Sequence, residues 1–174
     1  MAKKYLIVVD MQKDFVNKAL GTAEAQAIVP AVLDKVKNFD GEVIFTKDTH
    51  FADYLSTAEG RMLPVEHCIQ GTDGWMLIDE LEQYCAEHNN KVYEKLTFGC
   101  KELAQDMAQM QKEIVSVELI GLCTDICVVS NALLLKAFMP EVEIGVDAAC
   151  CAGVTPQAHE AALQTMKSCQ ICVK

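Results

Sequence analysis

A cysteine stands where the sequence predicts the start of a helix after a buried strand. The apolar, β-branched run 114–120 predicts the strand, and residues 128–139 have the apolar content of a helix packed on a sheet. Thr124 or Asp125 is a natural N-cap, because either side chain can accept a hydrogen bond from the first turn. Cys127 then falls in that turn, where free N–H groups and the helix dipole favour a thiolate. The pattern predicts a nucleophile, with an inert buried thiol as the alternative.

Two further reactive residues follow strands of the same predicted sheet. Asp10 ends the apolar run 5–10, and Lys95 follows the short strand 91–94. Because the carboxyl ends of parallel strands meet at one edge, Asp10, Lys95 and Cys127 could converge there. An acid can take the thiol proton, and an ammonium group can hold that carboxylate and favour a thiolate. Taken singly, Asp10 would be a loop or helix cap and Lys95 a solvated surface residue.

The long, non-periodic segment 47–75 carries a second group of reactive side chains, and loops of this length in compact domains are usually functional. The group consists of Asp48, His50, Glu59 and His67. Two imidazoles and one or two carboxylates suit one divalent ion, with zinc favoured and manganese or iron as alternatives. Asp48 and His50 alternate along an extended chain, so both side chains point to the same side. The alternative is a pair of loop histidines hydrogen-bonded to neighbouring carboxylates.

Strands and helices alternate along the whole sequence. Pro30 lies inside the first helical pattern, so that helix is expected to begin near it. The alternation predicts a three-layer αβα fold with a six-stranded, right-handed parallel sheet, in one domain over residues 1–174. The expected strands are 5–10, 42–46, 91–94, 114–120, 141–147 and 170–173, and the expected helices are 23–38, 75–89, 101–111, 128–139 and 156–168.

Composition and charge exclude several classes of partner. The net charge is −10 and no basic run occurs, which makes nucleic acid and anionic membranes poor partners. No apolar run approaches the length of a transmembrane helix. Nine cysteines and no recognisable secretory signal predict free thiols and a cytoplasmic location.

The remaining cysteines and histidines have less specific patterns. Four cysteines outside the nucleophile motif are interpreted as structural, and two histidines fall on the solvated faces of predicted helices. These residues are Cys150, Cys151, Cys169 and Cys172, and His88 and His159.

Five motifs occur in order along the chain: Val9–Phe15, Asp48–His50, Leu63–Cys68, Gly71–Trp75 and Gly121–Val128. Together they resemble the isochorismatase-like cysteine hydrolases, and within that superfamily they look most like nicotinamidases. The resemblance implies a catalytic triad of Asp10, Lys95 and Cys127 and a six-stranded parallel sheet. It also implies a cis peptide between Leu122 and Cys123, with the backbone N–H groups of Cys123 and Cys127 forming an oxyanion hole.

The resemblance also implies a metal site. Asp48, His50 and His67 match the family's metal ligands. Many nicotinamidases have a further histidine ligand that this sequence lacks, and Glu59 resembles a variant that uses glutamate instead.

A departure from the family concerns the substrate. Pro64 stands where many relatives have an aromatic residue, three positions before the last metal histidine. Phe15, Tyr54 or Phe98 could supply the missing ring, and Leu122 is a further candidate for substrate contact.

The function expected from the resemblance is hydrolysis of a small amide, most simply nicotinamide to nicotinate and ammonia in NAD salvage, through a thioester on Cys127. A ureido or N-carbamoyl substrate is the first alternative. Isochorismate is a second, although cleavage of its vinyl ether needs no thiol. A non-catalytic α/β module that binds a partner or senses redox state is a third. The family resemblance suggests a homo-oligomer, either a dimer or a tetramer.

Overall fold

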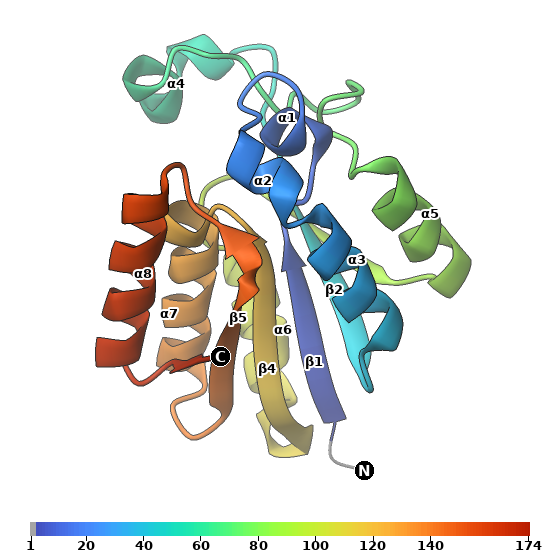
Figure 1. Ribbon diagram of the computed structural model, residues 1–174, viewed down its shortest axis with the longest axis vertical. Helices are drawn as coiled ribbons and strands as arrows, with labels where there is room; N and C mark the ends of the chain where they lie inside the picture. The colour runs from blue at the N-terminus through green and yellow to red at the C-terminus, as the bar shows by residue number, and fades with distance from the viewer. Residues whose placement is uncertain (1–2) are drawn as a thin grey trace.

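A six-stranded parallel sheet separates two layers of helices in the computed structural model, which describes residues 3–174 (Figure 1). The strands lie in the order β3-β2-β1-β4-β5-β6, and every neighbouring pair is parallel. They are β1 (Lys3–Val9), β2 (Glu42–Asp48), β3 (Lys91–Lys95), β4 (Ile114–Leu122), β5 (Glu143–Ala152) and β6 (Cys172–Val173). The predicted fold class is confirmed.

Helices cover both faces of the sheet (Figure 1). One layer contains α2 (Ala23–Ala27), α3 (Val29–Asn38) and α5 (Asp79–His88), and the other contains α6 (Lys101–Gln109), α7 (Val129–Phe138) and α8 (Pro156–Ser168). Above the carboxyl edge lie α1 (Lys13–Val16), the 3-10 turn η1 (Tyr54–Ser56) and α4 (Ala58–Met62), while the 3-10 turn η2 (Gln111–Glu113) precedes β4. Within residues 3–174, none of the helices has the length and apolar character needed to cross a membrane.

The two covered faces of strand β1 explain why its sequence is continuously apolar. Leu6 and Val8 pack with the α2, α3 and α5 layer, whereas Ile7 and Val9 pack with the opposite layer. All four side chains are completely buried. Because both faces of a central parallel strand are covered by helices, alternation with polar residues disappears.

Gly121 fixes how closely β4 approaches β1 just before the predicted nucleophile. Its φ is 113°, in the left-handed region, and a Cβ there would lie 2.1 Å from the Val9 carbonyl oxygen. Only glycine fits such an approach.

The helix expected over 23–38 is divided in two. Thr22 caps α2 by accepting a hydrogen bond from the Ala25 N–H at 3.0 Å, and α3 then begins at Val29. Pro30 lies in the first turn of α3, where its missing N–H leaves no helical bond unmade. The expected position of Pro30 is confirmed.

Candidate active site

The carboxyl ends of three strands bring Asp10, Lys95 and Cys127 together. Asp10 directly follows β1, Lys95 ends β3, and Cys127 lies in the turn after β4. The Lys95 Nζ is 2.7 Å from Asp10 Oδ2 and 3.4 Å from Cys127 Sγ. All three side chains are buried. The ammonium group therefore links the acid and the thiol.

Asp10 is held in a strained and specific orientation. Its φ is 48°, which is unfavourable for a residue with a side chain and is often found at functional positions. The Thr46 hydroxyl, on the neighbouring strand β2, donates to Asp10 Oδ1 at 2.6 Å. The backbone N–H of Asp10 donates in turn to the Thr46 carbonyl at 3.2 Å. These bonds fix the carboxylate against the sheet edge.

Lys95 has four polar partners although its side chain is only 1% exposed. Besides Asp10 and Cys127, its Nζ contacts Asp48 Oδ1 and the Thr97 carbonyl oxygen, each at 3.1 Å. Burial alone would lower the pKa of Lys95, but Asp10, Cys127 and Asp48 raise it well above its usual value. Lys95 is therefore a permanent positive charge.

The surroundings of Cys127 oppose loss of its thiol proton. Burial raises the pKa of Cys127 well above its usual value, and the negative charge of Asp10 acts in the same direction, against Lys95. Burial also raises the pKa of Asp10, with Lys95 opposing it. The expectation that the helix start favours a thiolate is wrong, because the side chain is almost fully desolvated and faces a carboxylate.

The turn that carries the nucleophile also differs from the sequence prediction. It is a π-helix, η3 (Thr124–Val128), with Cys123 at the cap position and no side-chain cap hydrogen bond. The Thr124 hydroxyl pairs with the His159 ring at 2.8 Å, and Asp125 Oδ1 accepts from a backbone N–H of the β5–α8 connection at 3.0 Å. The predicted N-cap role is therefore wrong for both side chains. The cis peptide between residues 122 and 123, implied by the resemblance, is present.

Four predicted metal ligands converge above the triad. One ligand atom from each of Asp48, His50, Glu59 and His67 lies within 4.8 Å of the others. His50 Nε2 is 3.0 Å from Asp48 Oδ2 and 3.4 Å from Glu59 Oε1, and His67 Nε2 is 3.7 Å and 3.8 Å from the same two oxygens. Glu59, in α4, is thus placed with the other three.

The electrostatics of this cluster favour a cation. Burial would raise the pKa of Asp48, but hydrogen bonds from His50 and His67 lower it below its usual range. Burial would lower the pKa of His50, but hydrogen bonds to Asp48 and Glu59 raise it to about 9. His67 Nδ1 lies 2.8 Å from the Val65 carbonyl, which directs Nε2 towards the cluster. Two imidazole nitrogens and two carboxylates with this preference for positive charge fit one divalent metal ion.

The sequence analysis missed two residues that hold the metal cluster. Gln12 is fully buried and uses its whole amide. Its Oε1 accepts from the Asp48 N–H at 2.7 Å, and its Nε2 donates to the Asp48 and Trp75 carbonyls, each at 2.9 Å. Asp14 Oδ2 accepts from the Cys68 N–H at 2.8 Å, next to the last histidine ligand. The sequence offered one signal for these two residues: both are polar and come shortly after a buried strand.

Asn131 in α7 was also missed. Its Nδ2 donates to the Cys127 carbonyl at 2.8 Å and to the Phe98 carbonyl at 3.0 Å. Its Oδ1 accepts from the Cys100 N–H at 2.8 Å. This buried amide ties the β3–α6 loop to Cys127, the predicted nucleophile.

A cavity of about 280 Å³ opens onto the thiol and the metal cluster. It is mainly apolar, with a few polar groups at the reactive end, as small-molecule sites usually are. The described residues that line it are Phe15, Leu20, Thr22, Asp48, Glu59, Leu63, His67, Phe98, Cys123, Ile126, Cys127 and Val154.

Two of the four residues expected to contact the substrate line this cavity. Phe15 and Phe98 line it, whereas Tyr54 and Leu122 are absent from its described lining. Tyr54 is fully buried, and its ring centroid lies 4.6 Å and 5.0 Å from those of His50 and His67, so it supports the metal cluster instead. Leu122 packs into the core. Substrate contact by Tyr54 and Leu122 therefore stays a prediction, which the described lining of this cavity does not support.

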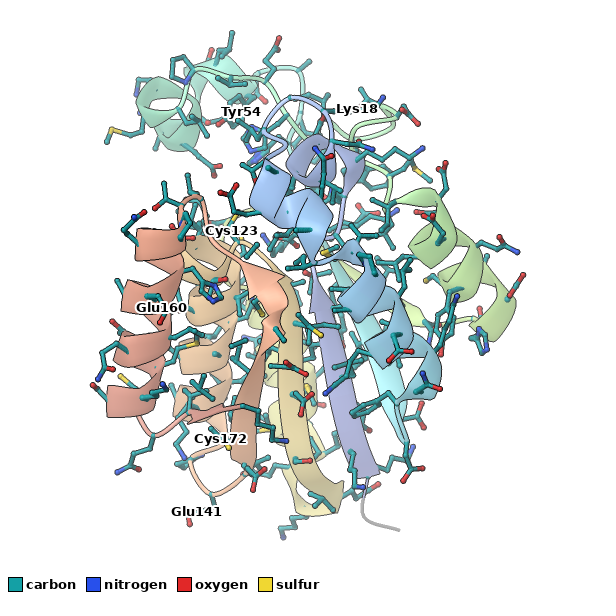
Figure 2. The ribbon with its side chains drawn as sticks, in the orientation of Figure 1. Lys18, Tyr54, Cys123, Glu141, Glu160 and Cys172 are labelled. Atoms are coloured by element: carbon teal, nitrogen blue, oxygen red, sulfur yellow. The ribbon has the colours of Figure 1, made fainter. Side chains whose placement is uncertain are left out.

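The other cysteines and histidines require two corrections. All nine cysteines are free; Cys150 and Cys151 are buried as expected, but Cys169 and Cys172 are exposed. Figure 2 shows Cys172 towards the lower end of the sheet, away from Cys123 at the upper edge and Tyr54 above it. A helix end and a short edge strand leave these two thiols uncovered.

Among the histidines, His88 is exposed as expected. His159 is half-buried, because its ring turns towards Thr124.

The fold and the three side chains at the sheet edge define the class of protein: an α/β cysteine hydrolase. Residues 4–173 match the family model of the isochorismatase domain, and the chain belongs to that family.

Similar proteins include members with assigned activities. An uncharacterised isochorismatase family protein of Bacillus subtilis is 30% identical over 75% of this chain and 77% of its own length. A crystal structure of a Bacillus subtilis nicotinamidase/pyrazinamidase is 30% identical, with a TM-score of 0.84 and 98% of each chain covered. The pyrazinamidase of Pyrococcus horikoshii, solved in complex with zinc, is 26% identical, with a TM-score of 0.80, covering 99% of this chain and 98% of that one.

Proposed function

We propose that this protein is a cysteine amidohydrolase that converts nicotinamide into nicotinate and ammonia. The observation that carries the proposal is the Lys95 ammonium group, which lies 2.7 Å from Asp10 and 3.4 Å from Cys127 beside a mainly apolar cavity. The activity named for the 30% identical Bacillus subtilis structure supports an amide of a nitrogen heteroaromatic ring as the substrate.

The first half of the reaction forms a thioester. Asp10 takes the proton of Cys127, and the thiolate attacks the carboxamide carbon. The backbone N–H groups of Cys123 and Cys127 stabilise the oxyanion. Asp10 then gives its proton to the nitrogen, the C–N bond breaks, and ammonia leaves. The burial that raises the pKa of Asp10 brings it closer to working pH, which suits a group that must both accept and donate a proton.

The second half hydrolyses the thioester. Asp10 takes a proton from water, and the resulting hydroxide adds to the acyl carbon. The C–S bond then breaks, nicotinic acid leaves and ionises to nicotinate in solvent, and the thiolate recovers the proton from Asp10. Lys95 keeps Asp10 oriented through their 2.7 Å contact, and its raised pKa favours the charged form of the ammonium group.

Asp48, His50, Glu59 and His67 are the residues that would hold a divalent metal ion, with zinc favoured by the donor set and by the zinc complex of the Pyrococcus horikoshii relative. A bound ion of this kind supplies a coordination position for a ring nitrogen. The apolar walls of the cavity orient the ring itself. Phe15 and Phe98 provide aromatic surface there, in a protein that has proline at position 64.

The test is ammonia release from nicotinamide and pyrazinamide by the metal-loaded protein, with benzamide and an N-carbamoyl amino acid as comparison substrates. We expect turnover of the first two and much weaker activity on benzamide, which lacks the ring nitrogen. Rapid acid quenching should leave an acyl group on Cys127, detected by peptide mass spectrometry. Preference for the N-carbamoyl compound, or an acyl group on another cysteine, would contradict the proposal.

We further infer the cellular compartment, domain organisation and oligomeric state of the enzyme. Nine free cysteines are consistent with a reducing, cytoplasmic compartment. The single domain over 1–174 and the homo-oligomer, dimer or tetramer, stay predictions, which limited proteolysis and light scattering would test.

A further inference from the structure

Thr124 connects the nucleophile turn, defined here as residues 123–127, to helix α8. Its side chain is completely buried, and its hydroxyl lies 2.8 Å from Nδ1 of His159. His159 stands in the first turn of α8, where its backbone N–H donates to the Thr155 carbonyl at 3.0 Å. A threonine at the start of a helical turn usually bonds that turn's own N–H groups. Here the hydroxyl is instead bonded to a side chain from a different element.

A second bond joins the same two segments. Asp125 Oδ1 accepts from the Val154 N–H at 3.0 Å, and Val154 lines the cavity beside Cys127. Adjacent residues of the nucleophile turn therefore bind the β5–α8 connection, one through a hydroxyl and one through a carboxylate. Two bonds from successive residues restrict both translation and rotation of the turn.

The β5–α8 connection is built to allow this approach. A Cβ on Gly153 would lie 2.8 Å from the His159 backbone nitrogen and 2.9 Å from Asp125 Oδ1, so a larger residue would push the two segments apart. Helix α8 begins rigidly, because the Thr155 side chain accepts from the Ala158 N–H at 3.1 Å and a proline occupies the first turn. His159 is thus presented from a fixed position.

We propose that His159 is a positioning residue for the hydrolysis: through Thr124 it fixes the backbone N–H groups that bind the oxyanion. This inference rests on the proposed function, since it requires an oxyanion to form. The N–H groups of Cys123 and Cys127 lie at the two ends of the turn that Thr124 and Asp125 anchor. Donors of this type act only when they stand about 2.7–3.1 Å from the oxygen of the transition state. A small displacement of the turn would therefore slow the chemical step more than it weakens substrate binding.

Two substitutions remove the bond while keeping the shape of the side chains. Thr124→Val deletes the hydroxyl, and His159→Phe deletes the ring nitrogen. Each should lower kcat for nicotinamide about tenfold to a hundredfold and leave KM within about twofold. A misplacement of about 1 Å can cost about a hundredfold, and complete loss of one oxyanion donor, which these variants do not cause, costs about 10²–10³-fold. Thr124→Ser, which keeps the hydroxyl, should retain most of the activity. The double variant should be no slower than the slower single variant, because both remove one bond.

Affinity for pyridine-3-carbaldehyde gives a readout that a merely structural role would not move. The Cys127 thiol adds across the aldehyde: a C–S bond forms, the carbonyl π bond breaks, and the thiol proton ends on the oxygen. The resulting hemithioacetal oxygen occupies the oxyanion position. The dissociation constant of the aldehyde, measured by calorimetry, should rise in the Thr124 and His159 variants in parallel with their loss of kcat/KM. The alkylation rate of Cys127 by iodoacetamide should stay unchanged, because that reaction develops no oxyanion.

His88→Phe is the matched control, because His88 is an exposed histidine whose Nδ1 lies 2.9 Å from the Tyr84 carbonyl of the same helix. It should leave kcat and aldehyde affinity unchanged. Aldehyde affinity equal in wild type and in the Thr124 and His159 variants would overturn the inference, and so would multiplicative losses in the double variant. A wild type that binds the aldehyde but releases no ammonia from any amide would refute the proposed function instead, and the aldehyde affinities would still decide the role of His159.

Discussion

Replacing Lys95 with methionine is the most informative perturbation of this site. The substitution keeps an unbranched apolar stem, one atom shorter, and removes an ammonium group that contacts Asp10, Asp48 and Cys127 at 2.7, 3.1 and 3.4 Å. Two buried carboxylates then lose their shared positive charge. The expected result is a protein that is less stable and almost inactive.

The size of the effect follows from the geometry. Unit charges 2.7 Å apart attract by about 6 kcal/mol at an effective dielectric constant of about 20, before desolvation is subtracted. Breaking a buried pair by removing one partner costs about 3–5 kcal/mol net, which is the loss of unfolding free energy expected for Lys95→Met. Without Lys95 the pKa of Asp10 rises further, because the positive charge that opposes the effect of burial is lost, and this disfavours the base form that takes the thiol proton. Since general-base catalysis contributes about 10²–10⁴-fold, kcat should fall within that range.

Denaturant unfolding and kcat, both measured across pH 5 to 9, check this prediction. Folded Lys95→Met binds a proton at Asp10 more readily than the unfolded chain does, so its stability should be greatest in acid and decline as pH rises. Its residual kcat should run the opposite way and increase with pH. Lys91→Met is the matched control, because Lys91 forms an exposed ion pair with Asp106. Wild-type kcat at every pH would show that Lys95 neither orients nor tunes the acid.

Three further predictions concern the thiols, the metal ligands and a remote charge cluster. Cys127→Ala should abolish turnover, whereas Cys123→Ala should keep most of it, because only the backbone N–H of Cys123 is used; comparable kcat values in the two variants would contradict this. His50→Ala should lose bound metal, measured by elemental analysis, and raise KM for nicotinamide while Cys127 still reacts with iodoacetamide; retention of a full metal equivalent would argue against the site. Burial would raise the pKa of Glu118, but hydrogen bonds from two lysines lower it. Glu118→Gln should therefore cost about 2 kcal/mol of unfolding free energy at neutral pH, because it breaks the ion pairs with Lys35 and Lys174. This loss should fade in acid, as pH falls through the lowered pKa of Glu118 in the folded wild type; a pH-independent difference would exclude the ion pairs as its cause.

The arrangement of strands was predictable because it depends on patterns along the chain. Alternating strands and helices require a parallel sheet, and a parallel sheet places the ends of β1, β3 and β4 at one edge. That reasoning brought Asp10, Lys95 and Cys127 together without any knowledge of distances. The helix boundaries differed from the prediction by several residues where local bonding intervened, as at Thr22, which begins a separate helix before Pro30.

Side-chain direction around turns was not predictable from the sequence. Threonine is a typical N-cap residue, yet the Thr124 hydroxyl forms its hydrogen bond with His159, which is 35 residues further along the chain. Tyr54 is an aromatic residue near the predicted metal ligands in the sequence, and only the packed structure shows that its buried ring lies against His50 and His67. The protonation of Cys127 depends on burial, which a local pattern does not reveal. In each case a partner distant in sequence decides the outcome.

The polar residues between the reactive ones show what the sheet edge alone does not provide. Converging strand ends bring groups within several ångströms, whereas catalysis requires placement within about half an ångström. Gln12 and Asn131 make this difference here, since each buried amide forms three hydrogen bonds, one set around Asp48 and the other around Cys127. A side-chain amide is uncharged and does not gain or lose a proton. It can therefore hold a metal ligand or a nucleophile in place without adding a charge beside it. A buried glutamine or asparagine beside a reactive strand end is therefore best interpreted as a positioning group. Its loss should displace the residues that it holds, without removing any reactive group.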